Sequence, residues 1–258
     1  MKVVFMGTGT SQGVPVIGAE NCGLDLSNPK NWRTRSSIHV EIAKKRVQVD
    51  ASPEFRLQCL KNNISFADLF ILTHGHADHI CGMDDLRRFC DKISNNILPV
   101  YSNEYGIERI RAMFPYALGE KPRERGYPCF KVAEMPAVME LSYQSRIYAE
   151  SLPHGPVETL GLVFEENGKR FAYYTDCKAL TARAEELAKN ADVLVLDCLR
   201  PKMHSSHMCV DEALSAIEKL CPKHAYLTHT TSHLDYEEFS KTLPQNCFMA
   251  YDGLVVEV

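Results

Sequence analysis

Histidine and aspartate side chains gather within six residues, in the stretch Ile71-Leu72-Thr73-His74-Gly75-His76-Ala77-Asp78-His79. Alternation in a turn puts His74 and His76 on one side, so two imidazoles can reach one cation. Asp78 and His79 follow, displaced enough to serve a second cation. Neutral imidazole and carboxylate are ligands that Zn²⁺, Mn²⁺ and Fe²⁺ accept. Four such groups in six residues favour a metal site over a polar loop that happens to be rich in histidine.

The flanking residues predict how this stretch is held. The apolar run Leu69 to Leu72 predicts a strand, and Gly75 allows a sharp turn. A helix is predicted over Cys81 to Lys92, where Leu86 and Phe89 stand three apart on one face. A strand end followed by a helix is where an open α/β sheet places its ligands.

Three further candidate ligands follow separate predicted strands. His154 follows a strand over Arg146 to Leu152 and lies between Pro153 and Gly155. Asp176 follows a strand over Arg170 to Thr175, and His229 follows a strand over Ala225 to Thr228. Since strand ends can converge on one edge of a sheet, we expect these side chains to share one site with the histidine-rich stretch.

The rest of the chain alternates strands and helices, which predicts an α/β protein. Asn167-Gly168 predicts a hairpin turn between Leu160 to Glu165 and Arg170 to Thr175. The other predicted strands are Val3 to Phe5, Ser37 to Ala43, Arg46 to Val49, Pro99 to Tyr101, Val193 to Asp197 and those around Phe248 to Val258. The other predicted helices are Pro53 to Lys61, Glu104 to Met113, Ala179 to Lys189, Asp211 to Leu220 and Tyr236 to Leu243. Without a visible linker or repeat, residues 1–258 are expected to form one domain.

Composition narrows the class of protein. The chain has 258 residues, of which 45% are hydrophobic and 24% charged, and its net charge is −4. Negative charge argues against strong nonspecific nucleic-acid binding. No apolar run is long enough for a bilayer, and Met1 to Met6 is too short for a signal peptide, so a cytoplasmic location is expected. The ten cysteines form no paired framework, and those such as Cys59, Cys90, Cys198 and Cys221 are interpreted as reduced core residues.

The pattern His-x-His-x-Asp-His resembles the signature of the metallo-β-lactamase superfamily. The resemblance implies a four-layer αββα sandwich with two divalent transition-metal ions, zinc or manganese, with iron also acceptable. It implies one ion held by His74, His76, His154 and Asp176, and the other by Asp78, His79, Asp176 and His229. Asp50 is implied to brace the metal loop without binding metal. A helix cap for Pro53 to Lys61 is an equally good interpretation of Asp50.

Such a pair of ions implies hydrolysis. Metal coordination lowers the pKa of water from 15.7 to about 7 in the best-known zinc enzyme. A hydroxide shared by two cations can attack phosphorus or a carbonyl carbon. The cations also stabilise the negative charge that develops on the oxygens of the attacked group. The predicted catalytic residues are Asp78 and His207.

Four further segments look like the PhnP-like phosphodiesterases, which act in carbon–phosphorus lyase pathways on cyclic phosphate sugars or related diesters. These are Gly7 to Pro15, Asp84 to Arg87, Leu227 to His229 and Tyr251 to Gly253. This resemblance implies a small, linear or cyclic, phosphodiester as substrate. It also implies that His207 stabilises the transition state or protonates the leaving oxygen. A loop histidine that caps the next helix is the alternative for His207, and His204 is a weaker candidate.

Other functions stay open at this point. A tRNA 3′-processing endonuclease shares the metal motifs, but usually carries a long arm that is not obvious here. A hydrolase of ester substrates and a metal-binding scaffold without turnover are further alternatives. The loop Gly7 to Gly13 has the wrong spacing for a dinucleotide fingerprint, so its expected role is to let backbone approach the metal pocket. A homodimer is also expected.

Two segments differ from the PhnP-like pattern or add to it. Relatives often hold a structural zinc with three cysteines and a histidine, but Ala19 to Leu24 contains only Cys22, and Ser232 replaces the histidine. We therefore expect no structural zinc. The segment Pro115 to Pro136 carries Lys121, Arg123 and Arg125, and is expected to be a surface loop, solvated or approaching the pocket.

Overall fold

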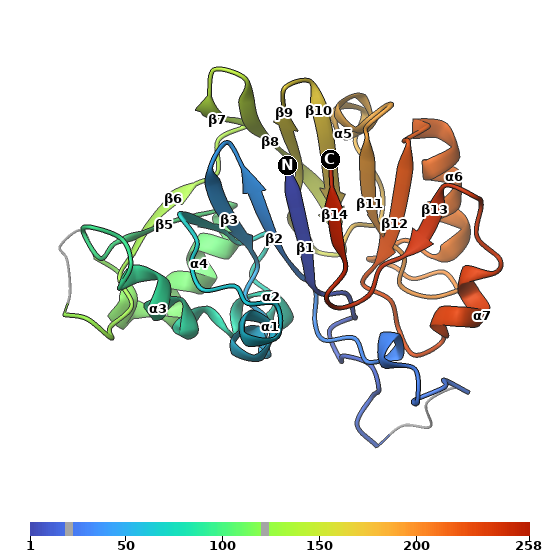
Figure 1. The fold of residues 1–258 in the computed structure, drawn as a ribbon, viewed down its shortest axis with the longest axis horizontal. Helices are drawn as coiled ribbons and strands as arrows, with labels where there is room; N and C mark the ends of the chain where they lie inside the picture. The colour runs from blue at the N-terminus through green and yellow to red at the C-terminus, as the bar shows by residue number, and fades with distance from the viewer. Residues whose placement is uncertain (19–22, 120–123) are drawn as a thin grey trace.

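Two seven-stranded sheets stack face to face in the computed structural model, which describes residues 1–18, 23–119 and 124–258 (Figure 1). The first sheet has the order β14 (Val255–Glu257), β1 (Lys2–Gly7), β2 (Ser37–Ile42), β3 (Lys45–Val49), β4 (Leu69–Ile71), β5 (Leu98–Ser102) and β6 (Phe130–Glu134). The second has the order β13 (Cys247–Met249), β12 (His224–Thr228), β11 (Val193–Asp197), β10 (Lys169–Tyr174), β9 (Val157–Glu166), β8 (Ser145–His154) and β7 (Val138–Ser142).

Helices cover the outer face of each sheet. The first sheet carries α1 (Phe55–Lys61), α2 (Ala77–Ile80), α3 (Arg87–Cys90) and α4 (Glu104–Met113), with the short 3₁₀ helices η2 (Met83–Leu86) and η3 (Pro115–Ala117). The second carries α5 (Ala182–Ala188), α6 (Val210–Leu220) and α7 (Tyr236–Ser240), and η1 (Pro29–Asn31) lies in the loop after β1. The predicted four-layer αββα sandwich is therefore confirmed.

Among the described residues, buried apolar side chains form one cluster between the two sheets and one between each sheet and its helices. Alternating residues along a strand contribute to the clusters on its two faces. Val3 and Phe5 of β1 point between the sheets, whereas Val4 and Met6 point to the helices of the first sheet. In β11 all five residues are buried, because the strand is covered on both faces. Burying each such side chain stabilises the fold by roughly 1.5–3 kcal/mol.

The predicted helix over Cys81 to Lys92 is wrong as a continuous element. Its residues form the short elements η2 and α3, and α2 ends just before them at Ile80. The break is at Gly82, whose backbone N–H donates to Ala51 O at 2.8 Å. A Cβ at Gly82 would overlap the carbonyl oxygen of Ser52 and lie 2.7 Å from Phe55 Cβ. Close packing against the segment after β3 therefore interrupts the helix.

Other differences are smaller. The segment Pro115 to Pro136 includes β6, which pairs in parallel with β5, so it is only partly a surface loop. Its Lys121 and Arg123, like Cys22, lie outside the described residues, and Arg125 is exposed. The edge strand β7 is not predicted by the sequence. Cys221 is exposed at the C-terminal end of α6, so its interpretation as a core residue is wrong.

The hairpin prediction is confirmed, since β9 and β10 pair antiparallel with Glu166 opposite Lys169. Within the residues that the structure describes, no helix is both long and apolar enough to cross a membrane.

Candidate metal centre

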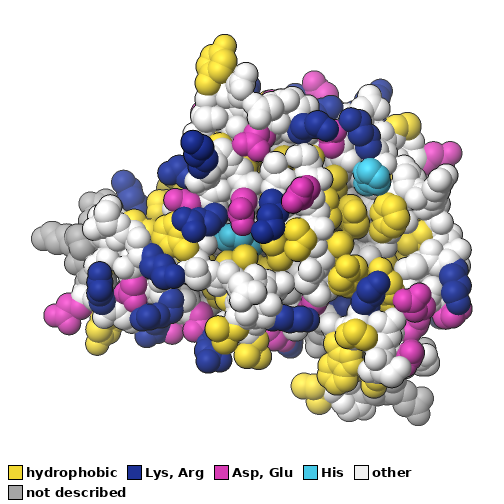
Figure 2. Space-filling model, in the orientation of Figure 1, with side chains coloured by type: hydrophobic (Ala, Val, Ile, Leu, Met, Phe, Trp, Pro, Cys, Tyr) yellow, Lys and Arg dark blue, Asp and Glu magenta, His cyan; other side chains and the backbone are white. Residues whose placement is uncertain are grey.

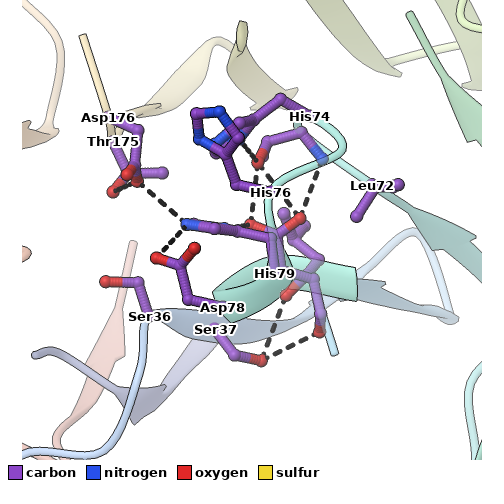
Figure 3. Close-up of polar contacts among 12 residues, drawn as sticks. Ser36, Ser37, Leu72, His74, His76, Asp78, His79, Thr175 and Asp176 are labelled. Atoms are coloured by element: carbon purple, nitrogen blue, oxygen red, sulfur yellow. Dashed lines mark hydrogen bonds and ion pairs between the residues drawn. The ribbon is translucent and has the colours of Figure 1, made fainter. Parts of the chain in front are cut away.

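The ends of four strands bring the seven predicted ligands together. Figure 3 labels His74, His76, Asp78, His79 and Asp176 among them. The loop after β4 carries His74 to His79, and His154 is the last residue of β8. Asp176 follows β10 by two residues, and His229 follows β12 directly. Six of the seven side chains are buried, and His76 is partly exposed at the opening. The structure thus places the predicted residues side by side, while their role as ligands stays a prediction.

Three imidazoles form the first group. The Nδ1 atom of His76 lies 2.9 Å from His74 Nε2 and 3.1 Å from His154 Nε2. The ring of His154 is oriented by its other nitrogen, since Nδ1 donates to the carbonyl oxygen of Ser206 at 3.0 Å. A carbonyl oxygen can only accept, so the Nε2 of a neutral His154 carries a lone pair.

The second group alternates imidazoles and carboxylates. His79 Nε2 lies 3.2 Å from Asp78 Oδ2 and 3.3 Å from Asp176 Oδ2. His229 Nε2 lies 3.1 Å from Asp176 Oδ1. Asp176 therefore turns one carboxylate oxygen to each of these two histidines.

Asp50 braces the loop after β4, and does not cap α1. It accepts hydrogen bonds from Thr73 N at 2.8 Å, from Thr73 Oγ1 and from His79 Nδ1 at 2.7 Å. The N-cap of α1 is Glu54, which makes no side-chain cap bond. Of the two interpretations of Asp50, the brace of the loop is thus confirmed and the helix cap is wrong.

Ser36 orients His229 in the same way. Its hydroxyl donates to Gly9 O at 3.1 Å, so its oxygen accepts from His229 Nδ1, also at 3.1 Å. Gly9 belongs to the glycine-rich loop, and a Cβ there would lie 2.5 Å from the carbonyl oxygen of Arg33. The loop thus brings its backbone up to the histidine shell, as the sequence predicts.

Three site residues adopt the left-handed backbone conformation, in which non-glycine residues are uncommon. The φ angles are 59° at Asp50, 53° at Asp176 and 58° at His229. Each lies directly after a strand or two residues beyond it. Such conformations persist only where the surrounding structure imposes them, and they cluster at functional sites.

The charges of the centre suit a cation. Burial lowers the pKa of His74 well below its usual value and that of His229 to about 4, so both rings are neutral near pH 7. Burial raises the pKa of Asp176, but the charges of His229 and His79 outweigh it and hold this pKa well below its usual range. Burial lowers the pKa of His79, yet Asp176, Asp78 and Asp50 together raise it well above its usual value. Three carboxylates thus favour positive charge beside them, which a proton on His79 supplies in the metal-free chain and which a bound cation would supply in place of that proton.

Acceptor atoms face one another at this centre. With Nδ1–H donated to Asp50, the Nε2 atom of a neutral His79 is buried with no hydrogen-bond partner, and faces two carboxylate oxygens. The lone pair of His229 Nε2 faces Asp176 Oδ1 in the same way. A cation between such acceptors removes their repulsion, so this donor set fits divalent metal.

His207 lies beside the ligands and is held by a residue that the sequence interpretation missed. Its Nδ1 atom lies 2.7 Å from Asp197 Oδ2, which also accepts from Cys177 N at 2.9 Å. The ring stacks on His229 with centroids 4.9 Å apart and lies 4.7 Å from that of His154. The sequence does contain a signal for Asp197, namely an aspartate at the end of an apolar strand. Asp50 and Asp176 follow their strands in a similar way.

His204 lies beside His207 at the edge of the centre. It is partly exposed, and its ring centroid lies 5.2 Å from that of His207. Its Nδ1 atom contacts Ser206 N at 3.3 Å and Ser206 Oγ at 3.2 Å. Among the described residues, all groups of metal-type ligands lie in this one centre, and a third group joins His207 to His154 and Asp176.

Comparison with known proteins identifies the family. Residues 45–230 match the model of the Beta-lactamase superfamily domain. A solved diphosphatase of the PhnP family is 33% identical, with a TM-score of 0.88 over 100% of this chain and 97% of the other. Zinc-bound PqqB from Methylobacterium extorquens is 18% identical, with a TM-score of 0.80 over 100% of both chains, which shows the fold alone.

Two curated relatives are also similar to this chain in sequence. An octanoyltransferase of Porphyromonas gingivalis is 32% identical over 98% of this chain, but the chain spans only 51% of that protein's length. An exodeoxyribonuclease, YycJ of Bacillus anthracis, is 23% identical over 85% of this chain and 87% of its own. The chain belongs to the metallo-β-lactamase superfamily, in its PhnP-like branch, as its motifs and fold predict.

Proposed function

We propose that this protein is a metal-dependent hydrolase that cleaves a small phosphodiester with two divalent cations. His74, His76 and His154 would hold one ion, and Asp78, His79 and His229 the other, with Asp176 shared between them. When bound, such ions lower the pKa of a water molecule and stabilise negative charge on phosphoryl oxygens. Zinc or manganese suits this set of nitrogen and oxygen ligands, and iron is also compatible.

The observation that carries the proposal is the tautomer pattern of the histidines. His79, His154 and His229 each have Nδ1 at a group that accepts its proton. In the neutral rings, each Nε2 atom therefore presents a lone pair to the same centre. His79 Nε2 in particular is buried with no hydrogen-bond partner, whereas a histidine that merely filled a polar core would use this nitrogen in a hydrogen bond.

His207 is proposed to protonate the leaving oxygen. Burial lowers the pKa of His207, but the carboxylate of Asp197 outweighs it, so the net shift of this pKa is upward. A protonated ring with Nδ1 at Asp197 has Nε2–H free to donate toward the centre. Asp78 is proposed to hold its ion and to keep the carboxylate side of the centre ionised. Burial raises the pKa of Asp78, but the charge of His79 outweighs it and lowers that pKa below its usual value.

Metal analysis and hydrolysis of bis-p-nitrophenyl phosphate test the proposal together. We expect close to two transition-metal ions per chain, and loss of at least one in the Asp176→Ala variant. His207→Ala is expected to slow turnover by about 10²-fold or more while keeping its metal. Active protein without metal, or hydrolysis of carboxylic esters or lactams in place of phosphodiesters, would refute the proposal.

A nuclease is the second candidate, because YycJ is named an exodeoxyribonuclease and aligns over most of its length. Labelled single-stranded DNA distinguishes the two candidates. If the loaded protein degrades DNA far faster than small phosphodiesters at equal metal content, the substrate is a nucleic acid. If only the small diesters are cleaved, the first proposal stands.

A further inference from the structure

A groove with a volume of about 450 Å³ lies between α1 and the η2–α3 segment, and contains none of the predicted metal ligands. Phe55 and Phe89 form its floor, with exposed fractions of only 1% and 3%. Leu60 and Ile64 line its walls. The groove therefore has an apolar interior in the size range of ligand and peptide sites.

Apolar surface continues from this groove along α1. Leu57 is 60% exposed and Leu60 is 62% exposed, and they stand three residues apart in the sequence, hence on one face of the helix. These two leucines form an apolar patch on a seven-residue helix, and the exposure of such a patch to water is unfavourable. Contiguous apolar patches of this kind mark interaction sites in soluble proteins.

Cations surround the same groove, in a chain with a net charge of −4. Arg56, Arg88 and Lys92 are exposed at its rim, whereas Asp85 is the carboxylate among its lining residues. Arg88 pairs with Asp91 at 2.8 Å. Figure 2 shows Lys and Arg side chains over α3, beside hydrophobic side chains over α1. The partner should therefore combine an apolar face with negative charge.

We propose that the α1–α3 groove docks an acidic amphipathic helix of a partner protein. In such a helix apolar side chains recur every three to four residues and would enter the groove and cover the patch on α1. Carboxylates on its flanks would face Arg56 on one rim and Arg88 and Lys92 on the other. This inference is independent of the proposed hydrolysis.

Other occupants match these features less well. Single-stranded nucleic acid uses exposed aromatic faces for stacking, but the rings of Phe55 and Phe89 are buried. The acidic residues Asp211 and Glu218 of α6 lie in the opposite outer layer. Docking α6 of a second copy would therefore give an open chain of copies, not a closed dimer.

A designed peptide tests the proposal with the full chain. The probe is a fluorescein-labelled, 18-residue helix with leucines on one face and glutamates elsewhere, and the comparison is a scrambled peptide of identical composition. Anisotropy should show the amphipathic peptide binding at least about tenfold more tightly, with affinity that falls as salt rises. Equal binding of the two peptides would overturn the proposal, because charge alone would then explain it.

Substitutions then locate the binding. The double variant Arg88→Glu/Lys92→Glu, and separately Leu60→Ser, should each weaken binding about tenfold or more. The matched double variant Lys131→Glu/Lys189→Glu, which changes exposed lysines elsewhere, should stay within about twofold. Circular dichroism of every variant checks that it is folded. Unchanged binding in the first two, stronger binding of an oligonucleotide or of anionic vesicles, or self-association abolished by Arg88→Glu/Lys92→Glu would each overturn the proposal.

Discussion

Single residues around the centre decide which nitrogen each histidine presents. Asp50, Ser36 and the carbonyl of Ser206 hold the Nδ1 atoms of His79, His229 and His154, respectively. Of these three orienting groups, only Asp50 is implied by the family resemblance, and nothing in the sequence points to Ser36 or to the carbonyl of Ser206. Their positions follow from long-range packing, which is why the sequence predicts the ligands better than the residues that orient them.

Asp50→Asn should weaken metal binding while leaving the ligands in place. The amide can still accept one hydrogen bond, but it no longer offers the negative charge that fixes His79 and the Thr73 backbone. Loss of such an orienting carboxylate typically costs 10–100-fold in metal affinity. Competition with a metallochromic chelator measures it. Asp68→Asn, which changes a surface carboxylate, is the control. An unchanged affinity in Asp50→Asn would mean that the brace is only structural.

The metal-free protein should lose stability when the pH falls below about 6.5. The pKa of His229 is about 4 in the folded protein because of burial, against 6.5 when exposed. Below 6.5 the unfolded chain therefore binds the extra proton, and the free energy of unfolding falls as the pH drops toward 4. A shift of this size corresponds to roughly 3 kcal/mol.

The raised pKa of His79 acts above that window. Its contribution is fully present below 6.5 and is lost as the pH rises through the raised folded value. Urea unfolding of chelator-treated protein from pH 4 to 9 measures both effects. His229→Gln should flatten the acidic side specifically, and an equally steep acidic side in that variant would contradict the assignment.

The strands position the site, because their ends meet at one edge of the sheets. These strands are the part of the fold that the sequence predicts best. The strand before each of His74, His154, Asp176 and His229 is visible as an apolar or alternating run. The interrupted helix after the metal loop is not visible in the sequence, because the helical pattern of apolar residues continues across Gly82. What breaks the helix is a contact with Ser52, thirty residues earlier, which local periodicity cannot report.

Gly82→Ala should therefore destabilise the fold strongly. Its new methyl group would overlap the carbonyl oxygen of Ser52, which is backbone and cannot rotate away. Overpacking of this kind costs about 1–3 kcal/mol or more. The neighbouring Cys81→Ala change, at an exposed position, should stay within about 0.5 kcal/mol. Urea unfolding compares the two, and equal stabilities would show that the backbone there can shift freely.

Across the whole molecule, the two ends of the chain are joined at one buried carboxylate. Asp252 accepts from Thr8 N and Thr8 Oγ1, both at 2.9 Å, and from Thr34 N at 2.8 Å and Thr34 Oγ1 at 2.6 Å. This ties the segment before β14 to the glycine-rich loop and to the segment before β2, which carries Ser36. The motif Tyr251-Asp252-Gly253 contributed to the resemblance, but its partners became visible only in the fold.

Asp252→Ala should cost about 3 kcal/mol or more in the free energy of unfolding, since each buried group left without a partner costs about 1–3 kcal/mol. Thr8 and Thr34 can rotate their hydroxyls toward other acceptors, but their backbone N–H groups cannot. Metal should partly restore stability, because it binds the folded chain only. Thermal unfolding with and without zinc measures both effects. If Asp252→Ala unfolds like the parent protein, the carboxylate does not hold the two ends together, and the backbone hydrogen bonds of the loop to Thr34 and Thr230 are sufficient to fix it.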